Sequence, residues 1–137
     1  MQELTHYIGG EHVKGTSGRF ADVFNPATGE VQARVPLASK EEMAKAVAIA
    51  AAAQPAWAAT NPQRRARVMM KYVDLLNRDM DKLAEALSRE HGKTLPDAAG
   101  DVQRGLEVIE YCIGAPQLLK GEYTDGAGPG IDMYSMR

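Results

Sequence analysis

Residues 94–115, with the sequence TLPDAAGDVQRGLEVIEYCIGA, constrain this 137-residue chain most strongly because they predict one long helix. Thr94 can cap the helix, and Pro96 falls in the first turn, where its missing N–H costs nothing. At 100° per residue, one apolar stripe contains Ala98, Val102, Gly105, Leu106, Ile109, Cys112 and Ile113. A second, half-apolar sector contains Gly100, Arg104, Val108, Tyr111 and Ala115. We therefore expect this helix to be covered on more than one side.

Two glycines and an arginine in this helix raise the question of a binding site. Gly100 and Gly105 each cost about 1 kcal/mol relative to alanine in a helix interior, which predicts a close approach by another backbone or a ligand. Arg104 lies between them, and its guanidinium needs a carboxylate, a phosphate or carbonyl groups. Asp101 and Glu107, at i−3 and i+3, could supply an ordinary surface ion pair. From the helix alone, the surface pair is the favoured interpretation.

The bulk properties exclude several classes of function. The net charge of −2 gives no basic field that would favour nucleic acid or an anionic membrane as a partner. The start of the chain lacks a signal peptide pattern, and no apolar run is long enough to span a membrane, so we expect one soluble, cytoplasmic domain. Cys112 lies on the apolar stripe and is interpreted as core packing. The three histidines are scattered, at His6, His12 and His91, and predict no metal site.

The chain before the long helix divides into strands and then helices. Residues 7–13 and 19–24 are predicted to form a hairpin with each other, and residues 31–35 a third strand after a turn at 25–30. A capping box at Ser39 opens a helix that we expect to run to about residue 54, where Pro55 ends or kinks it.

Two more helices follow before the long one. Asn61 and Pro62 open the first of them, and Asp79 can cap the second, at residues 80–91. Their inward positions are predicted to be Ala66, Met69, Met70, Val73, Leu76, Leu83, Ala84 and Leu87. The solvated side of the first is predicted to be Arg64, Arg65, Arg67 and Lys71.

The end of the chain is expected to be a glycine-rich loop and one strand. Residues 121–130 carry four glycines and are interpreted as an exposed loop, whereas residues 131–136 alternate at period two. A lone terminal strand would be an unpaired edge that must find a partner.

Motifs for nucleotide binding and catalysis fail when tested against their requirements. Gly92-Lys93-Thr94 resembles the end of a phosphate loop, but that motif requires glycine where this chain has Leu87. The glycine-rich residues 126–130 follow no strand and precede no helix in the predicted order, so they do not predict a dinucleotide site. No serine or cysteine lies in a nucleophile context.

Several motifs together resemble a known family. NPATGE and EHGKT resemble the N-terminal part of the NAD(P)-dependent aldehyde dehydrogenase superfamily, and the similarity extends along nearly the whole chain. The narrower run GDVQRGLEVIEYC, followed by APQLLKGE, resembles the branch of CoA-acylating methylmalonate-semialdehyde dehydrogenases. This resemblance implies an α/β parent fold, with this chain as its mostly helical N-terminal fragment, a small N-terminal β-hairpin or sheet and an unpaired C-terminal strand.

The resemblance also implies a division of the chain. Residues 1–118 would be the N-terminal part of the cofactor-binding domain, with a β-hairpin and four helices. Residues 119–137 would be a connector and the first strand of an oligomerisation region of a homo-oligomer, with a tetramer as the implied state. The family's catalytic cysteine, glutamate base and oxyanion-hole asparagine would lie beyond residue 137, so no catalytic role is carried over to Cys112.

The implied reaction belongs to valine catabolism and uses NAD and coenzyme A as co-substrates. A thiolate attacks methylmalonate or malonate semialdehyde and hydride passes to NAD; carbon dioxide is then lost and propionyl-CoA or acetyl-CoA forms. We expect the isolated chain to be inactive and to bind neither cofactor tightly. Arg104 matches the branch's arginine in GDVQRG, suited to the semialdehyde carboxylate, and this reverses the preference for a surface pair. The alternative is a free-standing helical assembly or regulatory module without catalysis.

Overall fold

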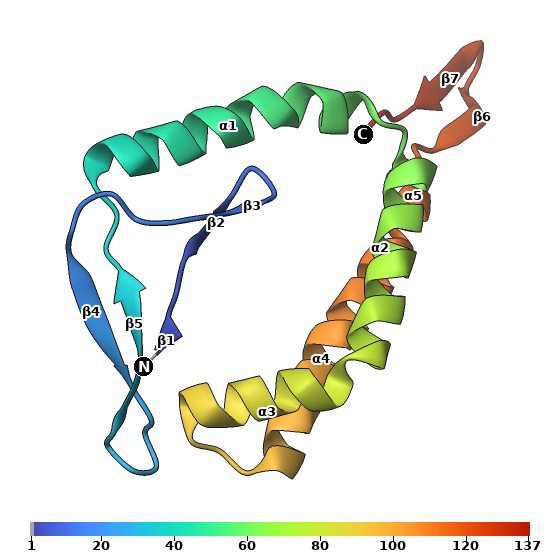
Figure 1. The fold of residues 1–137 in the computed structure, drawn as a ribbon. Helices are drawn as coiled ribbons and strands as arrows, with labels where there is room; N and C mark the ends of the chain where they lie inside the picture. Colours follow the sequence, from blue (N-terminus) through green and yellow to red (C-terminus); the bar gives the residue numbers. More distant parts are fainter. Residues whose placement is uncertain (1) are drawn as a thin grey trace.

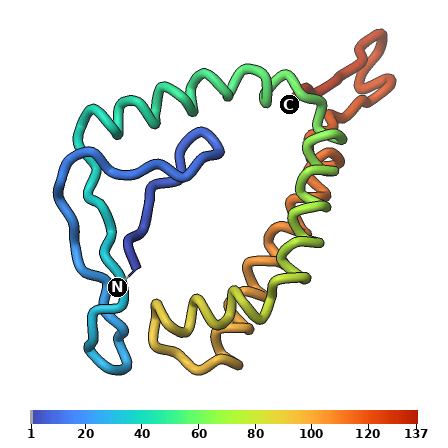
Figure 2. The backbone as a smooth tube through the Cα atoms, in the orientation of Figure 1, coloured from blue at the N-terminus to red at the C-terminus, as the bar shows by residue number. Residues whose placement is uncertain are grey.

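The structure, a computed structural model, describes residues 2–137. Its strands are β1 (Gln2–Glu3), β2 (His6–Ile8), β3 (Glu11–Val13), β4 (Phe20–Phe24), β5 (Val31–Pro36), β6 (Tyr123–Gly128) and β7 (Ile131–Tyr134). Its helices are α1 (Lys40–Ala59), α2 (Pro62–Arg78), α3 (Met80–His91), α4 (Leu95–Ile113) and α5 (Ala115–Leu118). The chain forms an open arc, with the N-terminal strands on one side, α1 above them, and α2, α3 and α4 on the other side (Figures 1 and 2).

The N-terminal strands pair differently from the predicted hairpin. Residues 7–13 are not one strand, because Gly9 and Gly10 turn the chain between β2 and β3, which pair antiparallel. Both glycines have positive φ, 64° and 86°, which glycine adopts without strain. β4 pairs antiparallel with β5, and β1 joins the other edge of β5 in parallel. The prediction that residues 7–13 pair with residues 19–24 is therefore wrong, although a small N-terminal sheet is present.

Helix α1 begins as predicted and ends later. The capping box is present, since the Glu42 amide donates to Ser39 Oγ at 3.2 Å and the Ser39 amide donates to Glu42 Oε2 at 2.8 Å. The expected end near residue 54 is wrong, because the helix continues through Pro55 to Ala59. Proline removes its own N–H donor, but the next turn keeps its bonds, with the Thr60 amide 3.2 Å from the Ala56 carbonyl oxygen. No residue of α1 is buried.

The packed part of the molecule is formed by α2, α3 and α4. Its most buried side chains are Ala66 on α2, Ala84 on α3, and Ala98 and Leu106 on α4, each at most 4% exposed. All four lie at positions predicted to face inward. Three of the four are alanines, whose small side chains allow close approach between helices. No helix among residues 2–137 has the length and apolar character needed to cross a membrane.

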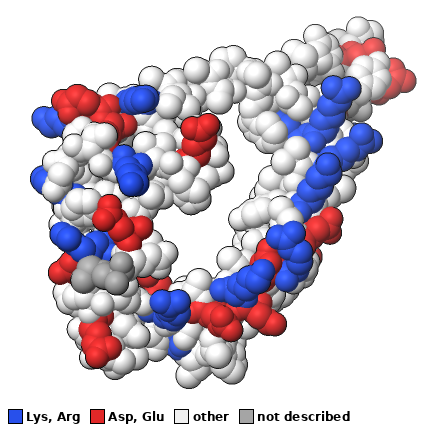
Figure 3. Space-filling view, in the orientation of Figure 1, with Lys and Arg blue, Asp and Glu red and all other residues white. Residues whose placement is uncertain are grey.

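The outer side of α2 is basic. Lys and Arg side chains run along this helix in Figure 3, where an opening is also visible through the centre of the arc. Arg64, Arg67 and Lys71 are exposed as predicted. Arg65 differs, because its side chain is half-buried and its Nε is buried without a hydrogen-bond partner among the described residues.

The predicted helix caps are only partly confirmed. Asn61 caps α2, because its Oδ1 accepts from the Arg64 amide at 2.9 Å. Asp79 and Thr94 precede α3 and α4, but neither side chain makes a capping hydrogen bond, so these two predicted caps are wrong. The Asp79 carboxylate instead pairs with Arg78 at 2.5 Å and with Lys82 at 2.9 Å.

The C-terminal strand is paired, so the expected unpaired edge is wrong. β7 pairs antiparallel with β6, which forms within residues 121–130 where a loop was expected, and Tyr123 lies opposite Tyr134. Asp132 stabilises this hairpin by accepting from the Tyr123 hydroxyl at 2.9 Å and from the Gly126 amide at 2.8 Å. The hairpin projects from the end of the arc (Figure 1) and leaves the apolar side chains of both strands exposed.

Candidate functional site

Arg104 lies near the middle of α4 with 68% of its side chain exposed. Its Nη2 pairs with Asp101 Oδ1 one turn earlier, as the i−3 spacing predicted. Glu107, the other predicted partner, instead accepts a hydrogen bond from Gln103 Nε2 at 3.3 Å. The structure therefore brings together Arg104 and Asp101.

A lysine that the sequence analysis did not assign to this site completes it. Lys93 precedes α4, and its Nζ contacts Asp101 Oδ2 and lies 3.0 Å from Asp97 Oδ2. We call Asp97, Lys93, Asp101 and Arg104 the charge row. Within the row the Lys93 side chain is the least exposed, at 17%, followed by Asp101 at 33%, Asp97 at 58% and Arg104 at 68%. The signal that could have revealed Lys93 is the pair of aspartates four residues apart, on one face of the helix that follows it.

The hydrogen bonds of the charge row shift the titration of its inner members. The hydrogen bond from Lys93, followed by that from Arg104, holds the pKa of Asp101 below its ordinary value. The hydrogen bonds to Asp101 and then Asp97 raise the pKa of Lys93 above its ordinary value. Both groups are therefore charged at neutral pH, and Arg104 faces a fixed anion.

The surroundings of Arg104 are open. Apart from the helix's own backbone, nothing among the described residues lies within 4 Å of a Cβ built at Gly105, and the nearest atom to a Cβ built at Gly100 is Arg104 Nη1 at 4.0 Å. The predicted close approach is therefore not made by residues 2–137. The sector predicted to be half-covered is also open, since Val108 is 63% and Tyr111 70% exposed. This leaves space beside the guanidinium.

Cys112 does not pack in the core as predicted. It is exposed, and it lines a pocket with Trp57 of α1 and Met69 of α2, at the corner where α4 meets α5. Ala98 and Leu106 are buried where α4 packs against α2 and α3, whereas in the last turn Cys112 is exposed and Ile113 is half-buried.

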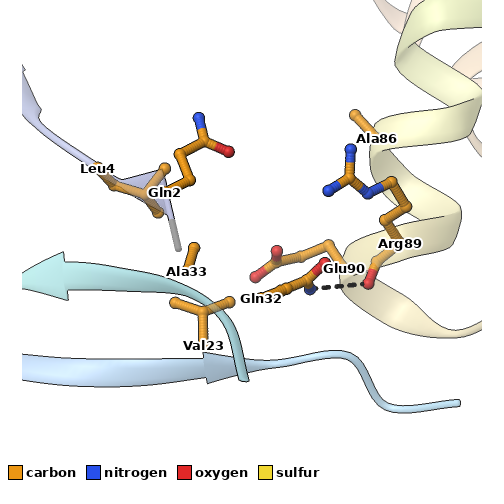
Figure 4. A pocket seen from close by; sticks show the side chains of 8 residues that line it. All are labelled: Gln2, Leu4, Val23, Gln32, Ala33, Ala86, Arg89 and Glu90. Carbon is orange, nitrogen blue, oxygen red and sulfur yellow. Dashed lines mark hydrogen bonds between the residues drawn. The ribbon is translucent and has the colours of Figure 1, made fainter. Parts of the chain in front are cut away.

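A separate pocket lies between the N-terminal sheet and α3 (Figure 4). Gln32 of β5 donates its Nε2 to the Arg89 carbonyl oxygen at 3.0 Å and so links the sheet to the helix. Residues from β1, β4, β5 and α3 line this pocket, and Arg104 is not among them.

No group of three or more His, Cys, Asp or Glu residues within positions 2–137 is placed to hold a metal ion. The exposed guanidinium of Arg104 makes the charge row the candidate binding site of the described chain.

Comparison with known proteins gives a consistent result at the level of sequence. Residues 12–137 match the model of the aldehyde dehydrogenase family. A malonate-semialdehyde dehydrogenase of Pseudomonas aeruginosa is 48% identical over 135 residues, which cover 98% of this chain and 27% of the relative. The mitochondrial acylating methylmalonate-semialdehyde dehydrogenase of Arabidopsis thaliana is 47% identical over 134 residues, which cover 98% of this chain and 22% of that protein. The chain spans about a quarter of the length of the curated relatives that it matches.

Solved structures agree in fold. A protein of Sinorhizobium meliloti 1021, provisionally assigned as a methylmalonate-semialdehyde dehydrogenase and crystallised with NAD, matches with a TM-score of 0.90 and 66% identity. The match covers all of this chain and 28% of that one. The methylmalonate-semialdehyde dehydrogenase of Oceanimonas doudoroffii matches with a TM-score of 0.89 and 43% identity, over 99% of this chain and 28% of that one. These matches confirm the aldehyde dehydrogenase-like parent fold. From the family match over nearly its whole length, this chain belongs to the aldehyde dehydrogenase family.

Proposed function

We propose that this sequence is the N-terminal part of an NAD-dependent, CoA-acylating methylmalonate- or malonate-semialdehyde dehydrogenase, to which it contributes the substrate-binding residue Arg104. The names of the similar proteins support this enzyme class. The observation that carries the proposal is the exposed guanidinium of Arg104, which makes one contact to Asp101 and keeps its other N–H donors available.

The chemistry of the substrate explains why an arginine would be needed. Methylmalonate and malonate semialdehydes each carry a carboxylate at one end and the reactive aldehyde at the other. A guanidinium binds a carboxylate through two parallel N–H···O contacts, which fix the orientation of the bound molecule as well as its position. Arg104 would hold the carboxylate, so that the aldehyde faces a nucleophile supplied by sequence beyond residue 137.

We assign neither co-substrate to residues 2–137. In the proposed reaction NAD accepts the hydride and coenzyme A accepts the acyl group. A phosphate cradle requires a glycine-rich turn that leads from a strand into a helix. The glycine-rich residues 126–130 instead fall within the hairpin formed by β6 and β7, so they do not fit a nucleotide.

The same proposal divides the chain into two regions. Residues 1–118 would form the N-terminal part of the cofactor-binding domain. Residues 119–137 would belong to the oligomerisation region of a homo-oligomer, with a tetramer as the expected state. The exposed Ile131 and Met133, each 58% exposed, support an apolar contact there. The cytoplasmic location stays a prediction, since the relatives include both bacterial and mitochondrial proteins.

The test is the substitution Arg104→Leu in the intact enzyme that contains this sequence. We expect kcat/KM for methylmalonate semialdehyde to fall on the order of 10- to 150-fold, the loss that follows from removing one charge-assisted contact. Propanal lacks the carboxylate, so kcat/KM for propanal should change little. Arg67→Leu, which removes an exposed arginine from α2, serves as the matched control and should change kcat/KM for neither substrate. Equal losses on both substrates would return Arg104 to a structural role.

A further inference from the structure

We infer that Lys93 is a positioning residue for Arg104: by sharing the carboxylate of Asp101, it keeps the guanidinium free to bind an anionic substrate. This inference rests on the proposed function of Arg104. It assigns a specificity role to a residue that does not touch the substrate.

The contacts divide Asp101 between two cations. Its Oδ1 faces Arg104 and its Oδ2 faces Lys93, so each oxygen has its own partner. Lys93 is itself held, because its Nζ lies 3.0 Å from Asp97 and only 17% of its side chain is exposed. Asp101 is thus held on the side opposite Arg104 by the less exposed of the two cations of the row.

The geometry matters because Asp101 competes with the substrate. A free aspartate three residues before an arginine can rotate to present both oxygens to the guanidinium, as a bidentate pair. Such a pair would use the same donors that a substrate carboxylate needs, and being intramolecular it would be present at high effective concentration. The contact of Lys93 with Oδ2 prevents this rotation. Arg104 then makes a single contact to Asp101 and keeps the rest of its five N–H donors for a ligand.

Charge balance leads to the same conclusion. The row contains two anions and two cations in alternation, so the negative charge of Asp101 acts on both of its neighbours. Without Lys93, that charge would act mainly on Arg104 and would weaken its attraction for a second carboxylate. Lys93 therefore matters for Arg104 only as long as Asp101 is present.

The test is a double-mutant cycle in the intact enzyme, with Lys93→Met and Asp101→Asn. We expect Lys93→Met to raise KM for methylmalonate semialdehyde about 3- to 10-fold, with kcat changed less than about twofold and propanal unaffected. Lys93→Arg keeps the charge and should restore most of the lost affinity. In the Asp101→Asn background, Lys93→Met should have no further effect on KM, because the competing carboxylate is gone.

The control and the contradicting results separate this inference from the proposed function. Lys82→Met removes a lysine that is 81% exposed and pairs with Asp79 outside the charge row. This variant should leave KM and kcat unchanged for both substrates. An undiminished effect of Lys93→Met in the Asp101→Asn background, or equal effects on semialdehyde and propanal, would overturn the role of Lys93. If Arg104→Leu still lowered kcat/KM for methylmalonate semialdehyde and not for propanal, the proposed function of Arg104 would stand without a role for Lys93.

Discussion

The helices α1 and α4 have almost the same length, 20 and 19 residues, yet they are buried very differently. α4 buries Ala98 and Leu106 against α2 and α3, because its apolar residues return with the helical period. α1 is rich in alanine all round, begins with a capping box and contains no buried residue. Its larger side chains remain exposed, including Val47 at 60% and Trp57 at 46%. One helix is stabilised by tertiary packing within this chain, and the other by its cap and by alanine's helix propensity.

The different burial of α1 and α4 indicates whether these residues can form a complete protein on their own. A free-standing module would leave the apolar side chains of α1 and of the β6–β7 hairpin in water. Contiguous exposed apolar surface on a soluble protein marks a contact with something else. The exposed apolar side chains of α1 and of the hairpin therefore indicate a contact with further polypeptide, either in the same protein or in another subunit.

The largest expected effect on stability comes from truncating the buried Leu106 side chain on α4. Leu106→Ala should lower the free energy of unfolding of the chain by about 2–5 kcal/mol, because a side chain that is only 2% exposed leaves a cavity. Val47→Ala on α1 should change it by less than about 0.5 kcal/mol. Urea denaturation followed by circular dichroism measures both. Similar losses at the two positions would show that α1 is packed after all.

The beginning of α1 and the buried face of α4 followed from local signals in the sequence. The capping box at Ser39 and the apolar spacing around Leu106 act over a few residues, so α1 begins, and α4 buries Ala98 and Leu106, where these signals predict. Two other features depend on more than local pattern. The pairing of the first strands depended on a turn at Gly9 and Gly10 inside the range predicted as one strand. Pro55 is tolerated within α1 because the backbone hydrogen bonds of the following turn are kept.

The candidate site was predictable in part for the same reason. Arg104 and its contact with Asp101 follow from spacing along one helix. The contact between Lys93 and Asp101 was not foreseen, because it joins a residue before the helix to one eight positions later and depends on how the chain enters α4. The openness around Gly105 depends on which elements cover the helix, which the spacing of residues along α4 does not reveal.

The second prediction uses the exposed face of α1. We expect the isolated chain to self-associate through its exposed apolar surfaces, and Val47→Lys should weaken that association several-fold by placing a charge in the contact. Light scattering over a concentration series measures the effect. Val68→Lys, at an exposed position on the basic outer side of α2, is the matched control and should change little. A monodisperse monomer at high concentration would refute the association itself.

The third prediction concerns the link between the sheet and the packed helices. Gln32→Ala removes the hydrogen bond to the Arg89 carbonyl oxygen and should cost about 0.5–1.5 kcal/mol of the free energy of unfolding. Gln63→Ala, on the exposed side of α2, provides the comparison and should be neutral. If both variants unfold at the same urea concentration as the parent chain, the two regions are not coupled through this contact.

The smallest effect should appear at low pH, at the junction of α2 and α3. Hydrogen bonds from Arg78 and then Lys82 lower the pKa of Asp79 from 3.8 to about 2. Because the folded pKa lies below the unfolded one, the carboxylate stabilises the fold above about pH 3.8, and this contribution disappears as the pH falls through 2. Asp79→Asn should therefore be less stable than the parent chain at pH 5, and the difference should shrink through pH 2 and vanish near about pH 1, below both pKa values. A difference in the free energy of unfolding that is as large at about pH 1 as at pH 5 would show that the ionised carboxylate is not its cause.

Carboxylate binding by Arg104 is tested most directly by a crystal structure of the intact enzyme with malonate, a carboxylate ligand that lacks the reactive aldehyde. One ligand carboxylate should lie about 2.7–2.9 Å from the guanidinium of Arg104, with Asp101 still bound to Lys93. Arg104 paired with Asp101 alone, and the ligand carboxylate held by a different cation, would contradict it.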